Sequence, residues 1–255
     1  MTTHFPKGHG IATMFLACSV LFLAACGGTA GGTSGGTAIV TKPVTATQIL
    51  ANAGKHSSLK DATFDMTITY SSGSPSIGPF TASGKMTLNP PRSDTILSGS
   101  VLGQPFTDET IMDGYDMYSK TTGSTIGSTS GDKWVKTTTH NISAGGIADP
   151  SLLTTFANLQ NVTLVGTETI NGHQAYHLKG TFASAPTPGT SDAGTNTSQG
   201  DLWLMTDSYY PLKNIVTSTV TRGATTATMT LVTTFKTWNT GITISVPPPS
   251  DLTTG

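Results

Sequence analysis

The sequence predicts an α+β fold in which an antiparallel sheet of about ten strands is accompanied by two short amphipathic helices. Apolar and polar residues alternate with a period of two over much of the chain, as they do in strands with one buried and one wet face. Turn signals rich in Gly, Pro, Asn and Asp separate these segments. About a fifth of the residues are Thr, a β-branched residue that suits the exposed face of a pleated sheet.

The N-terminal segment predicts a secretory signal, with a lone Lys7 followed by an apolar run from Ile11 to Ala25. The run is too short for a bilayer span, which needs about 18–20 apolar residues. At its end, Leu23-Ala24-Ala25-Cys26 resembles the lipobox of bacterial lipoproteins. That resemblance implies cleavage before Cys26, acylation of Cys26 with palmitate-like chains, and an extracytoplasmic protein anchored to the bacterial cell membrane. The alternative is an ordinary signal cleavage site with an incidental Cys.

Four regions follow from this interpretation. Residues 27–44 are a Gly/Thr/Ser tract that behaves as flexible coil and spans roughly 20–25 Å root-mean-square. The expected organisation is a lipoprotein signal peptide at 1–25, the lipidated Cys and tether at 26–45, one β-rich domain at 46–250 and a short tail at 251–255.

The first half of the domain predicts one helix and five strands. Residues 47–53 place Ile49, Leu50 and Ala53 on one helical face, and Gly54 ends the helix. Two alternating strands follow at residues 63–70 and 80–88. Asn89-Pro90-Pro91 ends the second strand, because Pro cannot donate to a ladder. Segments 93–102, 105–112 and 115–120 continue the alternation, with Asp113-Gly114 as a hairpin turn.

The second half predicts a helix at 149–159 and further hairpins. Asp149 caps this helix, Pro150 lies in its first turn, and four residues form its apolar stripe: Leu152, Leu153, Phe156 and Leu159. A strand at 133–136 precedes it. Asn171-Gly172 joins strands 162–170 and 173–182, residues 185–200 are expected to form a surface loop, and strands 201–206, 212–221 and 225–238 complete the sheet.

Charge and cysteine content exclude several classes of function. The chain has 13 basic and 14 acidic residues without a basic run, and removal of Lys7 with the signal leaves a formal net charge of −2. Nucleic acid is therefore not an expected partner. The two cysteines are Cys18, within the signal, and Cys26, so the folded domain is predicted to contain no disulfide, no Cys-ligated metal and no Cys nucleophile.

Enzyme motifs are not convincing in this chain. Segments 57–60 and 130–133 each match a Ser-x-x-Lys spacing, but the companion motifs of penicillin-recognising enzymes are absent. His173 and His177 would lie about 13 Å apart on a strand, too far to share a metal ion, and are interpreted as exposed. The acidic residues Asp108, Glu109, Asp113 and Asp116 lack the spacing of a calcium loop and are interpreted as solvated hairpin positions. We predict no enzymatic activity, no catalytic residue, no metal and no cofactor.

Several stretches carry a resemblance that covers about residues 45–250. They are residues 149–153, residues 166–178, Leu202-Trp203-Leu204-Met205-Thr206, Tyr210-Pro211-Leu212-Lys213 and residues 242–249. In this order they resemble the mycobacterial LppX/LprG-type lipoproteins and the wider LolA/LolB-like carriers. The resemblance implies a strongly curved, unclosed half-barrel sheet that covers its helices and encloses a hydrophobic cavity. It also implies that the protein carries acylated lipids or lipoproteins within the cell envelope.

The alternating apolar residues therefore have two interpretations. They form either an ordinary packed core or the lining of a lipid cavity, gated by helix 149–159. The candidate lining residues are Phe64, Met66, Ile68, Phe80, Met86, Leu88, Leu152, Leu153, Phe156, Tyr176, Leu178, Leu202 and Leu204. The sequence thus favours a monomeric, membrane-anchored lipoprotein that binds, and transfers, a lipid or glycolipid ligand. The alternative is a non-catalytic surface interaction or structural module with a packed core.

Overall fold

The alternating segments fold into strands, and the first predicted helix forms where Thr45 can cap it. The computed structural model describes residues 44–55, 58–71, 78–123, 133–138, 159–182, 195–222 and 225–253, all of which belong to one compact unit, Pro43–Gly255. Its elements are α1 (Ala46–Gly54), β1 (Asp61–Tyr70), β2 (Phe80–Leu88), β3 (Pro91–Val101), β4 (Gln104–Asp113), β5 (Asp116–Gly123), β6 (Val135–Thr138), β7 (Leu159–Ile170), β8 (His173–Phe182), β9 (Thr195–Met205), β10 (Pro211–Arg222), β11 (Thr225–Trp238) and the 3₁₀ helix η2 (Pro249–Asp251).

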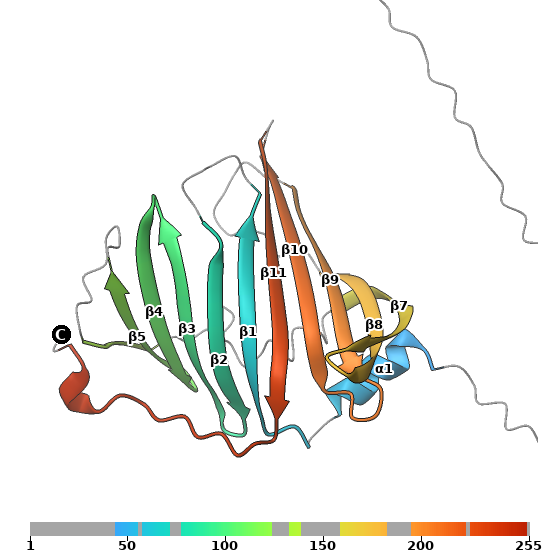
Figure 1. The fold of residues 1–255 in the computed structure, drawn as a ribbon, viewed down its shortest axis with the longest axis horizontal. Coiled ribbons are helices and arrows are strands. Elements are labelled where there is room, and N and C mark those ends of the chain that lie inside the picture. Colours follow the sequence, from blue (N-terminus) through green and yellow to red (C-terminus); the bar gives the residue numbers. More distant parts are fainter. Residues whose placement is uncertain are drawn as a thin grey trace, which may run out of the picture. The chain divides into compact units, whose positions relative to one another are not determined.

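All eleven described strands belong to one antiparallel sheet. Their order is β6-β5-β4-β3-β2-β1-β11-β10-β9-β8-β7, so two meanders meet where β1 pairs with β11 (Figure 1). Because β6 and β7 stand at opposite ends of this order, the sheet is unclosed. The predicted half-barrel of antiparallel strands is confirmed, with eleven strands described where about ten were expected.

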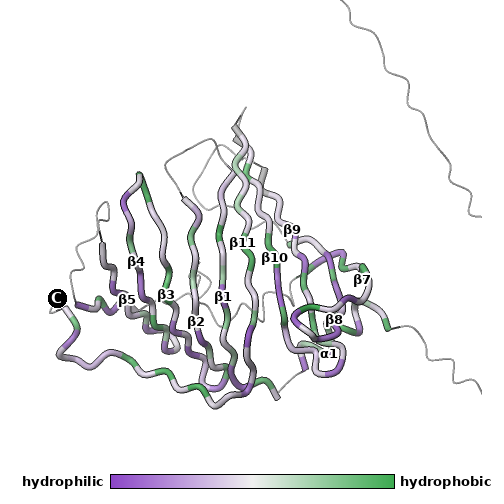
Figure 2. Tube along the Cα trace, viewed as in Figure 1, coloured by the Kyte–Doolittle hydropathy of each residue, from purple (hydrophilic) through white to green (hydrophobic). Residues whose placement is uncertain are grey.

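The sheet has two chemically different faces because successive side chains of a strand point to opposite sides. Figure 2 shows apolar and polar positions alternating along the strands. We define the inner face as the one that carries Phe64, Met66 and Leu178, and the outer face as the one that carries Asp65, Arg92 and His177; cross-strand partners assign the remaining residues to one face or the other.

Helix α1 covers one part of the inner face. Its N-terminus is closed by a capping box, in which Thr45 Oγ1 accepts from the Gln48 backbone N–H at 3.3 Å and Gln48 Oε1 accepts from the Thr45 backbone N–H at 3.0 Å. Ile49 is fully buried against Leu178 and Leu202 of β8 and β9. The predicted helix is confirmed, and it is held by packing because a single nine-residue helix is marginal alone.

The central strands β1, β2 and β11 carry a second inner cluster. The rings of Phe64 and Phe235 pack with centroids 6.3 Å apart, and Met66 and Met86 complete the contact. Gly84 lies opposite Phe64 and leaves room for its ring: a Cβ built there would be 2.5 Å from Phe64 Cζ and 3.0 Å from the Asp94 carbonyl oxygen.

Replacing Gly84 by Val is therefore expected to lower the free energy of unfolding by about 1–3 kcal/mol, because the added side chain displaces Phe64. Urea unfolding followed by Trp fluorescence measures the change. Gly166→Ala is the matched control, since nothing lies within 4 Å of a Cβ at Gly166 of β7. A Gly84→Val protein as stable as the control would contradict this packing.

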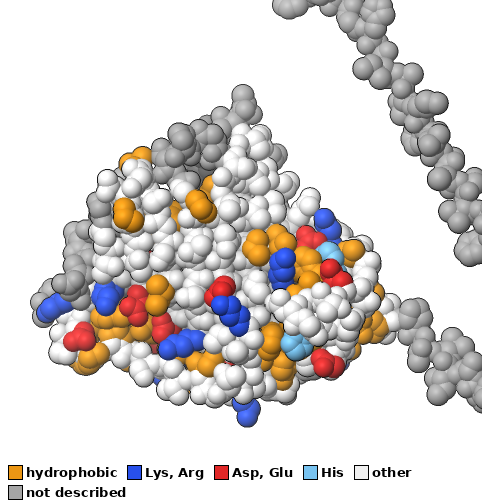
Figure 3. Space-filling model, viewed as in Figure 1, with side chains coloured by type: hydrophobic (Ala, Val, Ile, Leu, Met, Phe, Trp, Pro, Cys, Tyr) orange, Lys and Arg blue, Asp and Glu red, His pale blue; other side chains and the backbone are white. Residues whose placement is uncertain are grey.

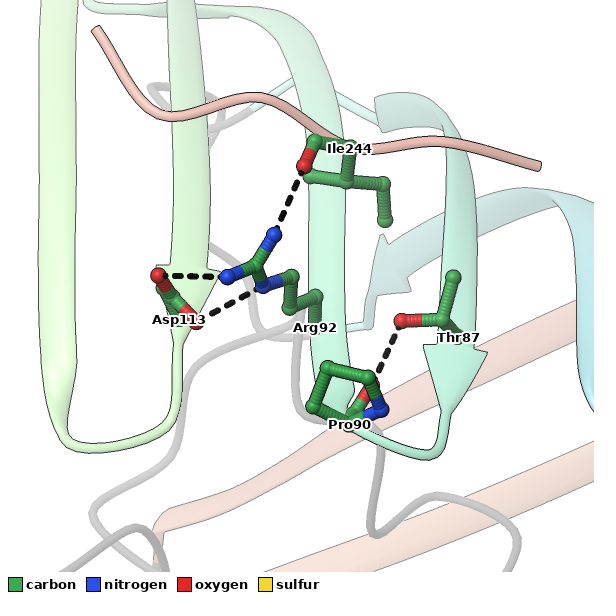
Figure 4. Close-up of polar contacts among 5 residues, drawn as sticks. All are labelled: Thr87, Pro90, Arg92, Asp113 and Ile244. Carbon is green, nitrogen blue, oxygen red and sulfur yellow. Dashed lines mark hydrogen bonds and ion pairs between the residues drawn. The ribbon is translucent and has the colours of Figure 1, made fainter.

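The C-terminal segment is fixed to the outer face by polar contacts. Arg92 donates from Nε and Nη2 to the Asp113 carboxylate at 2.7 and 3.1 Å, and from Nη1 to the Ile244 carbonyl at 3.1 Å (Figure 4). Figure 4 also shows Thr87 Oγ1 donating to the Pro90 carbonyl at 2.7 Å, across the turn that ends β2. Further along, Leu252 forms a bridge with Trp134 beside β6.

Asp61 fixes the start of this segment. It is buried at the start of β1, and its carboxylate accepts from the backbone N–H groups of Thr240 and Gly241 at 2.8 and 3.1 Å. The chain leaving β11 is therefore turned back onto the sheet by hydrogen bonds to a charged acceptor, which are stronger than neutral ones.

Two sequence predictions in the second half are wrong. Leu159, expected on the apolar stripe of a helix, begins β7, pairs with Phe182 and fills the space beside Gly180. Residues 195–200, expected in a surface loop, belong to β9, where Ser198 pairs with Ser218 of β10. Loop-like Ser, Thr and Gly content does not prevent pairing, because the ladder uses backbone groups. Residues 149–158 of the predicted helix lie outside the described residues.

The terminal strand β7 is irregular. Its pairing with β8 is interrupted by register shifts between Gln160 and Thr163 and between Leu164 and Gly166, and Asn161 has a positive φ of 53°. By contrast, the hairpin turn at Asn171-Gly172 forms as predicted, with positive φ at both residues. No helix within the described ranges is long and apolar enough to cross a membrane.

Candidate ligand-binding face

The inner face brings together most of the predicted lining residues. One group lies on β1 and β2, where Phe64, Met66, Ile68 and Met86 are almost completely buried and the half-buried Phe80 packs against them. Sequence analysis missed three members of this cluster: Ala62, Ala82 and Phe235. The alternation along β11 was a usable signal for Phe235, since Met229 and Leu231 precede it at intervals of two.

The second group lies on β8 and β9 beneath α1. Leu178, Leu202 and Leu204 are buried in one cluster with Ile49, and Tyr176 packs against it. Polar atoms also connect the helix to the sheet side of this cluster: Asn52 Nδ2 donates to the Tyr209 hydroxyl at 3.1 Å, and the Tyr209 ring stacks on Tyr176 with centroids 6.0 Å apart.

The structure does not bring all thirteen predicted residues into these clusters. Leu88 stands at the end of β2, paired with Pro91, and belongs to neither cluster. Leu152, Leu153 and Phe156 lie outside the described residues.

An aromatic row lies at the other end of the inner face. Tyr70, at the end of β1, meets Phe80 edge to face with centroids 5.8 Å apart, and Phe80 lies 5.7 Å from Phe106 of β4. Tyr70 is 40% exposed, whereas Ile68 beside it is buried. Gly99 makes the row possible, because a Cβ there would lie 2.0 Å from the Phe80 ring. The row leads from buried apolar side chains to the protein surface.

Several polar side chains lie on the inner face, and three of the buried ones have polar atoms without a hydrogen-bond partner among the described residues. Thr95, Asn214 and Thr233 are 2%, 1% and 0% exposed, and the side-chain polar atoms Thr95 Oγ1, Asn214 Oδ1 and Nδ2, and Thr233 Oγ1 have no hydrogen-bond partner among the described residues. Asn214 and Thr233 are direct cross-strand partners. Sequence analysis did not single them out, because nothing in the local sequence distinguishes a buried Asn or Thr from an exposed one.

The outer face carries the ion pairs found within the described ranges. Lys85 pairs with Asp94 at 3.1 Å, Lys120 with Glu109 at 3.8 Å, and Lys236 with Asp65. In Figure 3 acidic and basic side chains lie close together in a band across the molecule, interspersed with hydrophobic patches. Each charge is partly neutralised by its neighbour, so the face offers no continuous field of one sign.

In the ion pair of Lys136 with Asp116, each group shifts the pKa of the other. The hydrogen bond and the charge of Lys136 lower the pKa of the Asp116 carboxyl, to which Thr138 also donates, and the hydrogen bond to Asp116 raises the pKa of Lys136. With Arg92–Asp113 and Lys120–Glu109, this shows that Glu109, Asp113 and Asp116 are ion-paired rather than freely solvated. Asp108 instead points inward and accepts from Thr110 and Thr121.

The prediction that both strand histidines are exposed is wrong for His177. Its side chain is only 19% exposed, stacks on the Trp203 ring with centroids 4.2 Å apart, and lies between Glu168 and Asp201, at 3.2 Å from Nδ1 and 2.8 Å from Nε2. The two carboxylates face opposite nitrogens and do not converge on one point. In the part of the chain that the structure describes, no group of three or more His, Cys, Asp or Glu residues could hold a metal ion.

The topology and the two faces define a class of protein. This is an unclosed antiparallel half-barrel with a helix on its apolar inner face and an ion-paired outer face. The inner face can retain apolar molecules by excluding water.

Solved structures similar to this chain include two mycobacterial lipoproteins. LprF from Mycobacterium bovis is 17% identical, with 78% of this chain and 95% of that chain covered and a TM-score of 0.48. Lipoprotein LppX from Mycobacterium tuberculosis is 17% identical, covering 78% of this chain and 100% of that chain at a TM-score of 0.42. A LolA superfamily protein from Nitrosomonas europaea is 13% identical, covering 83% and 99% at a TM-score of 0.28.

These neighbours belong to the groups that the sequence resembles, and the likeness concerns the fold alone. No family model matches the chain, and the search of curated proteins finds no match.

Proposed function

We propose that this protein is a membrane-anchored envelope lipoprotein that binds a lipid or acylated ligand against its inner face and transfers it without catalysis. The observation that carries the proposal is the apolar inner face, on which the cluster under α1 and the cluster around Phe64 lie on either side of the polar pair Asn214 and Thr233, and which continues to the aromatic row at Tyr70. A partly exposed aromatic row beside buried aliphatic side chains suits the entry of an acyl chain.

Hydrophobic burial supplies sufficient affinity for such a ligand. Moving a 16-carbon chain out of water contributes on the order of 10 kcal/mol at about 0.8 kcal/mol per CH₂. Specificity then requires only the shape of the site and a few polar groups. Release does not require bond cleavage, because contact with another apolar surface offers the chain an equivalent environment.

Location is the second part of the proposal. Cys26 and residues 27–43 lie outside the described residues, and the support for anchoring is the lipobox-like sequence Leu23-Ala24-Ala25-Cys26. A flexible tract of Gly, Thr and Ser between an acylated Cys26 and the capped start of α1 would keep the domain within reach of lipid in the same membrane. The domain is proposed to act as a monomer.

Opposite faces of the sheet provide a matched test of where lipid binds. Phe80→Asp places a carboxylate in the aromatic row of the inner face, and Ile96→Asp places one on the outer face, where Ile96 is 44% exposed. In full-length protein, we expect Phe80→Asp to weaken binding of a fluorescent fatty acid at least tenfold, because an acyl chain cannot solvate a charge. Ile96→Asp should bind as the unmodified protein does.

Native mass spectrometry of protein extracted from its own membrane supplies an independent result. We expect adducts with lipid masses that are lost on delipidation. Protein that carries no lipid and also fails to bind the fluorescent fatty acid would refute lipid binding and favour the packed interaction module. Equal weakening by both Asp variants would show that the fatty acid does not bind the inner face.

A further inference from the structure

The central row of the inner face contains a polar pair between two apolar regions. Following the cross-strand partners from β2 to β8, the row reads Ala82, Met66, Thr233, Asn214, Leu202 and Leu178. Ala82 and Met66 belong to the cluster around Phe64, and Leu202 and Leu178 to the cluster under α1. Asn214 and Thr233 thus stand where the two clusters meet.

Both side chains of this pair are buried without a bond. Asn214 is 1% and Thr233 0% exposed, and no atom of the Asn214 amide, nor the Thr233 hydroxyl, has a hydrogen-bond partner among the described residues. Buried polar groups in folded proteins are normally paired, since an unpaired one loses its bonds to water without replacement. A buried amide with both its donor and its acceptor free therefore calls for a partner from outside the chain, either an ordered water or a ligand.

The chemistry of the pair specifies that partner. The amide NH₂ and the hydroxyl can both donate to a carbonyl oxygen, and neighbouring strands place the two Cβ atoms about 5 Å apart. Apolar side chains flank the pair on both sides along the row. The matching ligand has carbonyl groups at its centre and hydrocarbon chains that extend to both sides, which a diacylglycerol provides when its two acyl chains point in opposite directions from the glycerol.

We propose that Asn214 and Thr233 bind the ester carbonyl of a diacyl lipid that displaces the groups now covering them, with its two chains extending toward the two inner clusters. This inference rests on the proposed function and adds the residues that read the polar centre of the ligand. It predicts selectivity for ester-linked over ether-linked lipids, because an ether oxygen is a poorer acceptor and leaves the amide unpaired.

The test is a competition between two lipids that differ only in the carbonyl groups. Full-length protein in a saccharide detergent is mixed with equal amounts of a 1,2-diacylglycerol and the 1,2-dialkylglycerol of the same chain length. Native mass spectrometry then gives the ratio of the two adducts, in which competition by detergent cancels. We expect about a tenfold preference for the diester, corresponding to about 1.4 kcal/mol.

Three variants locate that preference. Asn214→Leu, close in volume, should reduce the ratio to about one, and Thr233→Val should reduce it by about threefold. Thr234→Val, on the same strand but facing outward opposite Asp65, should leave it unchanged. Without ligand, neither inner variant should lower the melting temperature measured by circular dichroism, since a group without a bond loses nothing on replacement. If Asn214→Leu fails to fold, this expectation is refuted for the amide, and Thr233→Val decides the role of the hydroxyl.

The possible failures are distinguishable. Adducts of both lipids in equal amounts in the unmodified protein would overturn this inference and leave lipid binding intact. A preference that survives in both Asn214→Leu and Thr233→Val would also overturn it, as would a fall in melting temperature that shows the pair to be bonded within the protein. Absence of both adducts would overturn lipid binding itself, and the inference with it.

Discussion

Phe64→Ala is expected to lower the free energy of unfolding by about 3–5 kcal/mol, the usual cost of removing a buried aromatic side chain. Phe64 is 1% exposed, packs against Phe235 and Met66, and fills the space left by Gly84. A domain of this kind is stable by about 5–15 kcal/mol, so the substitution removes a large part of the total. Urea unfolding of delipidated protein, followed by circular dichroism, measures it.

Thr67→Ala is the control for this prediction, because Thr67 is an exposed residue of the same strand. It should change the stability by less than about 1 kcal/mol. A loss below that value for Phe64→Ala as well would mean that Phe64 faces open space in the ligand-free protein rather than close-packed neighbours.

Cys26→Ser is expected to abolish acylation completely. The Cys26 thiol is the proposed attachment point of the lipid, and a Ser hydroxyl cannot replace it because it is a much weaker nucleophile than a thiolate. Each buried CH₂ contributes about 0.8 kcal/mol to membrane binding, so a protein without acyl chains loses the anchor rather than a fraction of it. Metabolic labelling with an alkyne-tagged palmitate, followed by the intact mass of the mature protein, measures the result.

Cys18→Ser provides the matched control, since Cys18 is the other cysteine of the chain and lies inside the predicted signal. It should leave both the label and the mature mass unchanged. Retention of the label in Cys26→Ser would contradict the lipobox interpretation and move the protein to the class with ordinary signal cleavage.

Alternation predicted the strands well, because successive side chains of a strand face opposite sides of the sheet. The polarity of each face was less regular, since the outer face also carries buried apolar clusters around Tyr118 and Trp203. The helix at α1 was equally accessible, since Thr45, Ile49 and Gly54 each carry a local signal for a start, a buried face or an end. These features depend on nearest neighbours in sequence, and they remained correct in the fold.

The errors arose where a long-range partner decides the structure. Leu159 continues the apolar spacing of a helix, yet its position is set by Phe182 and Gly180 across the ladder. His177 has no local signal that distinguishes it from an exposed strand residue, because its partners Glu168 and Asp201 lie on the two neighbouring strands.

The polar residues of the candidate site, Asn214 and Thr233, could not be predicted from the sequence for the same reason. The 36% of apolar residues in the chain indicates how much can be buried, but not which polar side chains are buried with them. Thr233 follows Leu231 in the alternation of β11 and is one of many Thr residues, and only its pairing with Asn214 makes it notable.

The interrupted register of β7 has a consequence for the proposed membrane-anchored form of the protein. Molecules confined to a plane collide far more often than the same number free in a volume, and a straight terminal strand would let them join backbone to backbone. In β7 the two register shifts and the positive φ of Asn161 interrupt the regular backbone that another strand would need for continuous pairing. We therefore expect that neighbouring copies do not associate through edge-to-edge pairing of their β7 strands.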